Sequence, residues 1–184
     1  MIFMLLVYCD GGTRKGRGAW SYIIVRAPLS SVAKDYMGKL SGPILTHGQG
    51  THPAALHSSH MELIAAYEGI KHAITLPKEP ITVVSDSNYV TAGLDRAHAR
   101  ALSAESSDKD YSEIVKMWKE LILLNAFHDI GTMHVKGHKK QTGNTFCDHI
   151  CGEVLTRGDR HIGHLVRLFN NSKSWRASLV KTRR

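Results

Sequence analysis

Apolar positions divide the first part of the chain into short runs that are typical of β-strands. Residues 2–9 are aliphatic and β-branched and end at a pair of glycines, which predicts a buried strand. A basic, Gly-rich turn over residues 13–18 leads to a second apolar run over residues 19–26, so the two runs predict a hairpin. We expect a third strand within residues 34–45.

The rest of the chain alternates between helical and strand patterns. Residues 47–59, which hold Gly, Pro and three His, are expected to form a loop. Apolar spacing and flanking residues predict helices over residues 61–75, 87–94, 111–122 and 144–156, and strands over residues 81–84 and 130–135. The order β-β-β-α-β-α-α-β-α predicts an α/β fold, in which a mixed sheet carries helices on its faces.

Charge narrows the classes of partner. The chain has 24 Lys and Arg against 16 Asp and Glu, a net charge of +8 and a pI near 9.5. A small protein this basic favours polyanions, of which nucleic acid is the commonest, although a surplus that serves only solubility would look the same. No amphipathic helix rich in Lys and Arg indicates binding to a membrane surface.

The three cysteines and the apolar start of the chain place further limits. An odd number of Cys without a secretory signal argues against a disulfide framework, and the spacing of Cys147 and Cys151 does not fit a zinc site. Residues 1–7 are apolar but too short, and lack the basic start of a signal peptide. We therefore expect reduced thiols and a soluble, cytoplasmic protein.

Four acidic residues stand where an apolar element ends or turns: Asp10, Glu62, Asp86 and Asp148. Carboxylate oxygens are the ligands that Mg²⁺ prefers, and a pair of such ions can stabilise both oxygens of a phosphodiester displacement. Each acid also has a structural alternative. Glu62 could complete a capping box with Ser59, Asp86 could cap a helix, Asp10 could be a turn residue and Asp148 a solvated charge.

The residues around these acids resemble the type-one class of the ribonuclease H family. Residues 5–12 resemble its first strand and Asp-Gly-Gly turn, and residues 60–66 its Met-Glu-Leu helix start. Residues 84–90 resemble its Ser-Asp-Ser-x-Tyr-Val motif, and residues 135–148 its Gly-His…Asn-x-x-x-Asp motif. Four such motifs occur in the family's order, and together they cover roughly residues 2–156.

The resemblance implies an RNase H-like, five-stranded mixed sheet of three antiparallel strands and two parallel additions, flanked by helices. It implies a catalytic domain over residues 1–156, and leaves residues 157–184 as a basic tail that either joins this domain or is a solvated terminus. Asp10, Glu62, Asp86 and Asp148 would bind two Mg²⁺ ions, with Mn²⁺ as a substitute. His138 would assist proton transfer or product release.

The implied reaction is cleavage of the RNA strand of an RNA–DNA hybrid, leaving a 5′-phosphate and a 3′-hydroxyl. The enzyme is expected to act as a monomer without an obligate protein partner. Residues placed like the substrate contacts of the family are Gly11, Gly12, Ser58, Ser59, Ser87 and Asn88. The glycines would let a backbone approach closely, and the start of a helix at Ser87 favours a phosphate.

The sequence departs from the family at three places. Ser58 and Ser59 stand where relatives carry an Asn pair, and residues 95–110 lack the basic, Trp-containing handle that grips the DNA strand. The basic tail, with Lys173, Arg176, Lys181, Arg183 and Arg184, could replace that handle electrostatically. Histidines 47, 52, 57 and 60 are too loosely spaced for a zinc site and are interpreted as part of a flexible insertion.

Three alternatives stay open. A nuclease of the same fold could cut another duplex or a junction, and a catalytically silent module could only bind nucleic acid. The chain could also be a domain cut from a reverse transcriptase polyprotein.

Overall fold

The computed structural model describes residues 2–31, 42–53, 57–96, 112–137 and 142–181 of the 184 residues. Its centre is one five-stranded sheet in the order β3-β2-β1-β4-β5. The strands are β1 (Phe3–Arg14), β2 (Arg17–Pro28), β3 (Ile44–His52), β4 (Ile81–Ser85) and β5 (Ile130–His134). β2 is antiparallel to both β1 and β3, whereas β4 is parallel to both β1 and β5, which confirms the predicted mixed sheet.

The first hairpin is longer than the sequence predicts. β1 continues through Gly11 and Gly12, and the chain turns only at Lys15 and Gly16, whose φ angles are 51° and 74°. Two residues with positive φ form the kind of tight turn whose twist matches paired antiparallel strands. A single short 3-10 helix, η1 (Leu29–Ser31), follows β2.

The third strand lies further along the chain than predicted. It spans Ile44–His52, so its first two residues overlap the expected strand and residues 47–52 fall in the stretch expected to be a loop, while residues 34–41 of the expected strand lie outside the described residues. Its polar, Gly-containing sequence has little strand propensity of its own. A Cβ on Gly48 or Gly50 would lie 2.4 or 2.5 Å from ring atoms of Tyr22 and Trp20, so these glycines admit the two rings of β2. Pairing with β2 therefore decides the conformation.

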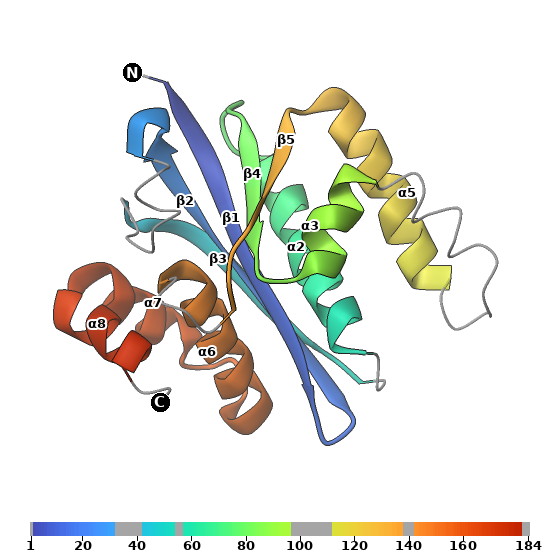
Figure 1. Ribbon diagram of the computed structural model, residues 1–184. Helices are drawn as coiled ribbons and strands as arrows, with labels where there is room; N and C mark the ends of the chain where they lie inside the picture. The colour runs from blue at the N-terminus through green and yellow to red at the C-terminus, as the bar shows by residue number, and fades with distance from the viewer. Residues whose placement is uncertain (1, 32–41, 54–56, 97–111, 138–141, 182–184) are drawn as a thin grey trace.

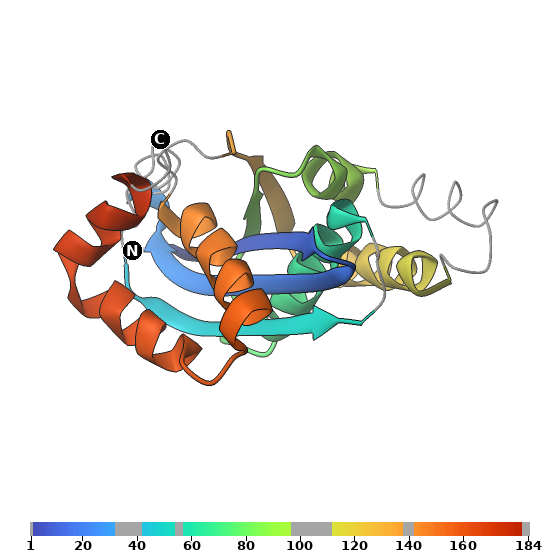
Figure 2. The ribbon, with the colours of Figure 1, turned by 90° about the horizontal axis from the view of Figure 1, so that it is seen from below.

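One face of the sheet is covered by α2 (Ser58–Ala73), α3 (Asn88–Asp95) and α5 (Ser112–Phe127) (Figures 1 and 2). The apolar side of α2 packs on β1 and β2 through buried residues such as Leu63, Ala66 and Ile70. The three predicted helices on this face are confirmed, although α2 begins at Ser58, three residues before its expected start. No helix in the described part of the chain is long and apolar enough to cross a membrane.

The other face is covered by α6 (Thr142–Arg157), α7 (Ile162–Asn171) and α8 (Lys173–Lys181) (Figures 1 and 2). The weak pattern after residue 157 did not predict α7 and α8. Phe169 of α7 is completely buried and stacks on Phe146 of α6, with 4.3 Å between ring centroids. Asn170 bonds both backbone groups of Ile44, with its Oδ1 2.9 Å from the amide nitrogen. These contacts attach α7 to α6 and to β3.

Candidate active site

Two of the four acids are brought together by the parallel pairing of β1 and β4. Tyr8 of β1 lies opposite Val84 of β4, so Asp10 and Asp86 each lie two residues beyond the same pair. Because the strands run in the same direction, both carboxylates lie just beyond the last pair of β1 and β4, at the carboxyl end of β4. Open α/β sheets bind their ligands beyond the carboxyl ends of their strands.

Asp10 carries the strongest electrostatic perturbation of the four acids. Burial raises its pKa well above the ordinary value, and the negative charges of Asp86, Asp148 and Glu62 raise it further. One hydrogen bond opposes these effects, because the Gly11 N–H donates to Asp10 Oδ1 at 2.8 Å. The site thus concentrates negative charge on half-buried carboxylates, and a bound cation would relieve that repulsion.

Glu62 reaches the site because the first turn of α2 lies directly on β1. A Cβ built on Gly11 would lie 2.2 Å from the carbonyl carbon of Met61 and 2.4 Å from the amide nitrogen of Glu62. Only glycine leaves room for this main-chain contact. Burial raises the pKa of Glu62, whereas a hydrogen bond from Ser87 lowers it and the charge of Asp86 raises it.

Asp148 comes from the opposite face, on α6. The preceding residue, Cys147, is completely buried, and its carbonyl accepts a 2.8 Å hydrogen bond from the Ser21 hydroxyl of β2. One turn later, the Cys151 thiol lies 3.4 Å from the carbonyl oxygen of Asp10. These contacts hold the half-buried Asp148 close enough to Asp10 to influence its pKa.

The structural alternatives for three of the acids are wrong. The N-cap of α2 is His57, so Glu62 is not part of a capping box with Ser59. The N-cap of α3 is Ser87, whose hydroxyl accepts from the Val90 N–H, so Asp86 does not cap that helix. Asp10 lies within a continuous strand and not in a turn.

The expected substrate residues fall into two groups. Ser58 and Asn88 are exposed and Gly12 and Ser59 are half-buried, and all four stay predicted contacts. The space beside Gly11 is filled by α2, so the close approach that this glycine permits is made by the protein itself. Ser87 is buried, and it both caps α3 and donates to Glu62.

Three neighbours of the site were not predicted from sequence. A Cβ on Gly137 would lie 2.5 Å from Asp86 Oδ2, and a ring nitrogen of His134 lies 3.1 Å from the carbonyl oxygen of Asp86. The third is Cys151. The pairing of Ser85 with His134 would have revealed the first two, but it requires the strand register. His138 lies outside the described residues.

The four acids have the donor chemistry that hard divalent cations require, since all supply carboxylate oxygen. In the described part of the chain, no three His, Cys, Asp or Glu side chains are arranged to hold one ion as they stand. Asp10 and Glu62 instead accept hydrogen bonds from Gly11 and Ser87. The four carboxylates and their mutual repulsion fit Mg²⁺. A bound ion would compete with Gly11 and Ser87 for the oxygens of Asp10 and Glu62. The described histidines likewise form no group that could hold a zinc ion.

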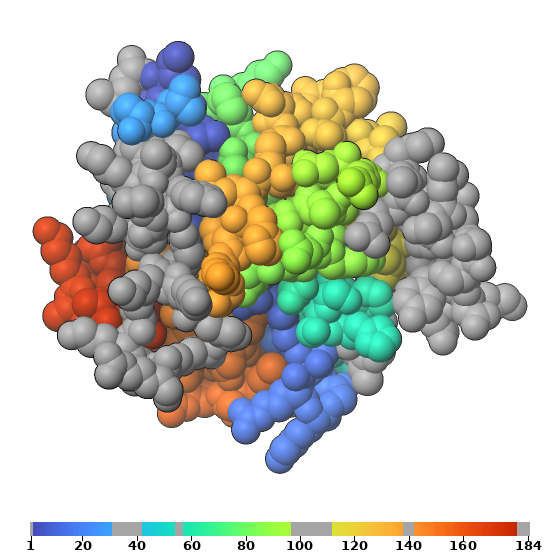
Figure 3. Space-filling model, in the orientation of Figure 1, coloured from blue at the N-terminus to red at the C-terminus, as the bar shows by residue number. Residues whose placement is uncertain are grey.

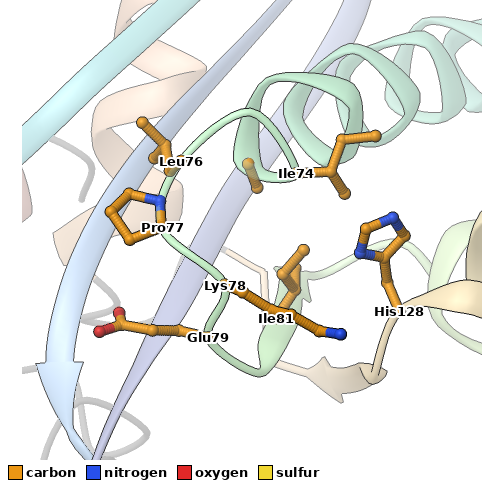
Figure 4. A pocket seen from close by; sticks show the side chains of 8 residues that line it. Ile74, Leu76, Pro77, Lys78, Glu79, Ile81 and His128 are labelled. Carbon is orange, nitrogen blue, oxygen red and sulfur yellow. The ribbon is translucent and has the colours of Figure 1, made fainter.

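A separate hollow of about 190 Å³ lies at the other end of the sheet, beside the start of β4 (Figure 4). Ile74, Leu76 and Ile81 supply much of its apolar lining, with His128 at one side. None of the four acids lines it, and Glu79 at its margin is paired with Arg26. The hollow is therefore not part of the acidic site.

The comparisons with known proteins agree with this arrangement. The family model described as RNase H matches residues 4–156, which includes all four acids. The chain belongs to the RNase H family. A protein named Ribonuclease H from Caldanaerobacter subterraneus is 31% identical over 156 residues, covering 82% of this chain and 90% of the relative. Another from Caldicellulosiruptor saccharolyticus is 25% identical over 158 residues, covering 82% and 95%.

Solved structures show the same RNase H fold. LC9-RNase H1, described as a type 1 RNase H with the type 2 active-site motif, has a TM-score of 0.64 at 19% identity and covers 97% of this chain and 86% of its own. RNase H1 from Halobacterium salinarum has a TM-score of 0.57 at 17% identity, with 83% and 97% covered. The protein is an RNase H, a nuclease of the hydrolase class. The family match ends at residue 156, so α7 and α8 lie beyond it.

Proposed function

We propose that this RNase H is an endonuclease that hydrolyses the RNA strand of RNA–DNA hybrids with the help of two Mg²⁺ ions, for which Mn²⁺ can substitute. The observation that carries the proposal is the convergence of the acids: the β1–β4 register brings Asp10 and Asp86 together, and the start of α2 lies on Gly11 beside Glu62. The charges of the three other acids, Asp148 included, raise the pKa of Asp10. A site of crowded carboxylates favours cations. It lies at the strand ends where sheets of this kind bind ligands, and the chain belongs to a nuclease family. The products would be a 5′-phosphate and a 3′-hydroxyl.

In this proposal, Asp10, Glu62, Asp86 and Asp148 hold the metal ions. When bound, the ions would activate water and neutralise the charge that develops on the phosphate. Ser87 keeps Glu62 oriented through its hydrogen bond. His138, next to Gly137, would move a proton at the reacting phosphate or assist product release.

The residues at the rim of the site would recognise the substrate. Ser58 and Ser59 begin α2 about one turn before Glu62, and their hydroxyls can donate to and accept from a ribose 2′-hydroxyl. Asn88 begins α3 on the other side of the acids, where its amide can bond the duplex backbone or minor groove. Contacts to 2′-hydroxyls would restrict cleavage to the RNA strand.

The test is cleavage of end-labelled duplexes with Mg²⁺, with Mn²⁺ and with EDTA. The panel holds an RNA–DNA hybrid, double-stranded RNA, double-stranded DNA and single strands. We expect cutting only of the RNA strand of the hybrid, and none in EDTA. Cutting of another duplex would overturn the substrate but retain the nuclease, whereas binding without any cutting would indicate a silent binding module.

Asp10→Asn and Asp86→Asn are the matched inactive variants. Each should reduce cleavage by at least about 10³-fold, because the amide removes a metal-binding charge. The fold should survive, since the protein already disfavours the charged form of Asp10. In EDTA, Asp10→Asn should therefore melt at the same temperature as the wild type or higher. A much lower melting temperature would instead give Asp10 a structural role.

A further inference from the structure

The tip of the β1–β2 hairpin carries three exposed basic residues, Arg14, Lys15 and Arg17, which we call the hairpin cations. Together with Leu155 and Thr156 of α6, they line a hollow of about 250 Å³. No acidic side chain is among these lining residues. In Figure 3 the hairpin, in blue, projects from the lower edge of the molecule beside the orange surface of α6. The tip is thus open to a large ligand.

The local charge arrangement opposes the stability of the hairpin. Arg14 and Arg17 are direct cross-strand partners, and like charges placed opposite one another destabilise a strand pair. Among the described residues, no Asp or Glu forms an ion pair with a hairpin cation. Glu153, on the adjoining helix, is paired with Arg157 at 3.4 Å and His161 at 2.7 Å. A cluster of cations kept without acids points to an anionic ligand.

The backbone holds this cluster in a fixed position. Pairing of β1 with β2 is continuous from Phe3 and Pro28 to Arg14 and Arg17. The two-residue turn places Lys15 at a φ of 51°, a conformation that usually selects Asn, Asp or Gly. The hairpin cations therefore stand at the end of a rigid arm, whose first strand also carries Asp10.

The length of that arm sets the distance to the acidic site. Arg14 follows Asp10 by four residues along β1, which corresponds to about 13 Å of extended strand. Successive phosphates of one duplex strand are about 3.4 Å apart along the helix axis. For a duplex whose axis follows this arm and whose cleaved bond lies at Asp10, a phosphate about four base pairs away would lie at the hairpin.

We propose that the hairpin cations form a phosphate subsite, which binds the backbone of a nucleic-acid duplex about four base pairs from the cleaved bond. This inference rests on the proposed function, because it takes Asp10 as the point of cleavage. Arginine can grip a phosphate through two parallel hydrogen bonds. Phosphate contacts position a duplex without reading its sequence, so the subsite contributes affinity and register and leaves the chemical step unchanged.

The test compares two double variants with the same loss of charge. Arg14→Gln with Arg17→Gln removes two hairpin cations, and Lys71→Gln with Lys78→Gln removes two exposed cations at the opposite end of the sheet. In an Asp10→Asn background, binding of a hybrid is measured from 50 to 300 mM salt. The hairpin variant should bind about tenfold more weakly at 0.1 M salt, with the slope of log K against log salt reduced by about 1 to 2.

The control should bind within about twofold of its parent, since only long-range charge is lost. In the active protein, the hairpin variant should raise KM and leave kcat unchanged. Its melting temperature should equal or exceed that of the wild type, because a like-charge pair is removed. A lower melting temperature together with a fall in kcat would assign the hairpin a structural role. An equal loss of binding in both variants would show that net charge, and not the position of the hairpin cations, determines the affinity, and it would overturn the subsite.

Duplex length locates the contact. Two hybrids are prepared in which the preferred cleavage site lies two base pairs from one end or from the other. The difference between the wild type and the hairpin variant should disappear for one of them and persist for the other. Loss or persistence in both would contradict a contact at a fixed distance. If no hybrid is cut but the binding difference remains, the subsite stands without the proposed function; cutting without a binding difference removes the subsite alone.

Discussion

The two faces of the sheet hold their acid-bearing helices by different means. On one face, the main chain of α2 at Met61 and Glu62 lies directly on Gly11 of β1. On the other, α6 rests on side chains: Phe146 stacks on Phe169, and Ser21 bonds the backbone at Cys147. One contact is between two backbones, and the other is a layer of rings, thiols and hydroxyls.

This difference teaches how precisely each acid is positioned. A main-chain contact has no side chain that could rotate or repack, so the position of Glu62 relative to Asp10 is fixed closely. A layer of side chains relaxes partly when one of them is truncated, and the loss of unfolding free energy depends on how well its neighbours fill the cavity. We therefore expect changes near Gly11 to affect cleavage first, and changes in the α6–α7 layer to affect stability first.

Of the changes to these two contacts, the largest effect on cleavage should follow from Gly11→Ala. The new Cβ would lie 2.2 Å from the carbonyl carbon of Met61, which is too close for two non-bonded atoms, so α2 would have to move. We expect a loss of about 3 kcal/mol in unfolding free energy, at the upper end for overpacking. Displacement of Glu62 by about 1 Å should also lower kcat by about 100-fold. Chemical denaturation and steady-state cleavage of a hybrid measure the two effects.

Gly12→Ala is the matched control for stability. A Cβ on Gly12 would meet no atom within 4 Å, although this glycine adjoins Gly11 in the same strand. Its unfolding free energy should stay within about 0.5 kcal/mol of the wild type. Equal destabilisation by the two substitutions would mean that strand flexibility, and not the contact with α2, explains the glycine pair.

The same contrast explains which parts of the fold could be predicted from the sequence. The order of the strands and the main helices followed from apolar periodicity, because residues such as Leu63 and Ile70 face a core on a regular repeat. β3 could not be predicted in this way. Its conformation depends on the rings of Trp20 and Tyr22, which are far away in the sequence and need Gly48 and Gly50 opposite them.

The site was predicted only as far as residue identity allows. Asp10 and Asp86 were identified as partners, and the β1–β4 register now explains why they meet. Gly11 and Ser87 were predicted as substrate contacts. Their contacts within the protein could not be predicted, because these depend on how closely α2 approaches the sheet and on which hydroxyl faces Glu62. α7 was missed because only three of its residues, Ile162, Val166 and Phe169, are buried.

The second prediction tests the layer of side chains. Phe169→Ala should lower the unfolding free energy by about 3–5 kcal/mol, since it removes a completely buried ring that stacks on Phe146. The kcat of the molecules that remain folded should change by less than about threefold, because this layer relaxes before Asp148 moves. Denaturation curves give the first quantity, and cleavage at low temperature gives the second.

Phe127→Ala makes the same chemical change at a residue that is 77% exposed, at the end of α5. It should alter the unfolding free energy by no more than about 0.5 kcal/mol. A fall in kcat for Phe169→Ala as large as that for Gly11→Ala would end the distinction between the two faces. It would show that Asp148 is positioned as rigidly as Glu62.

The smallest effect concerns a polar contact within the α2 face. The Tyr67 hydroxyl of α2 donates to the Glu120 carboxylate of α5. Burial raises the pKa of Tyr67, and the hydrogen bond to Glu120 and its charge raise it further. Tyr67→Phe should cost about 1–2 kcal/mol at pH 7, the usual value of a hydrogen bond to a charged group.

The dependence of this contact on pH follows from the direction of the shift. A tyrosine in the unfolded chain loses its proton near pH 10, whereas Tyr67 in the folded protein retains its proton to higher pH. Its contribution to stability is therefore complete below pH 10 and falls as pH rises above it, by at most about 1.4 kcal/mol per pH unit for one proton. The stacked rings of Phe146 and Phe169 on the other face do not titrate. The stability advantage of the wild type over Tyr67→Phe should shrink between pH 10 and 11.5. Glu120→Gln keeps an acceptor but removes the charge, so it should lose less unfolding free energy than the wild type over the same pH range. Parallel curves for the wild type and Tyr67→Phe would show that the phenol does not stabilise the packing of α2 on α5.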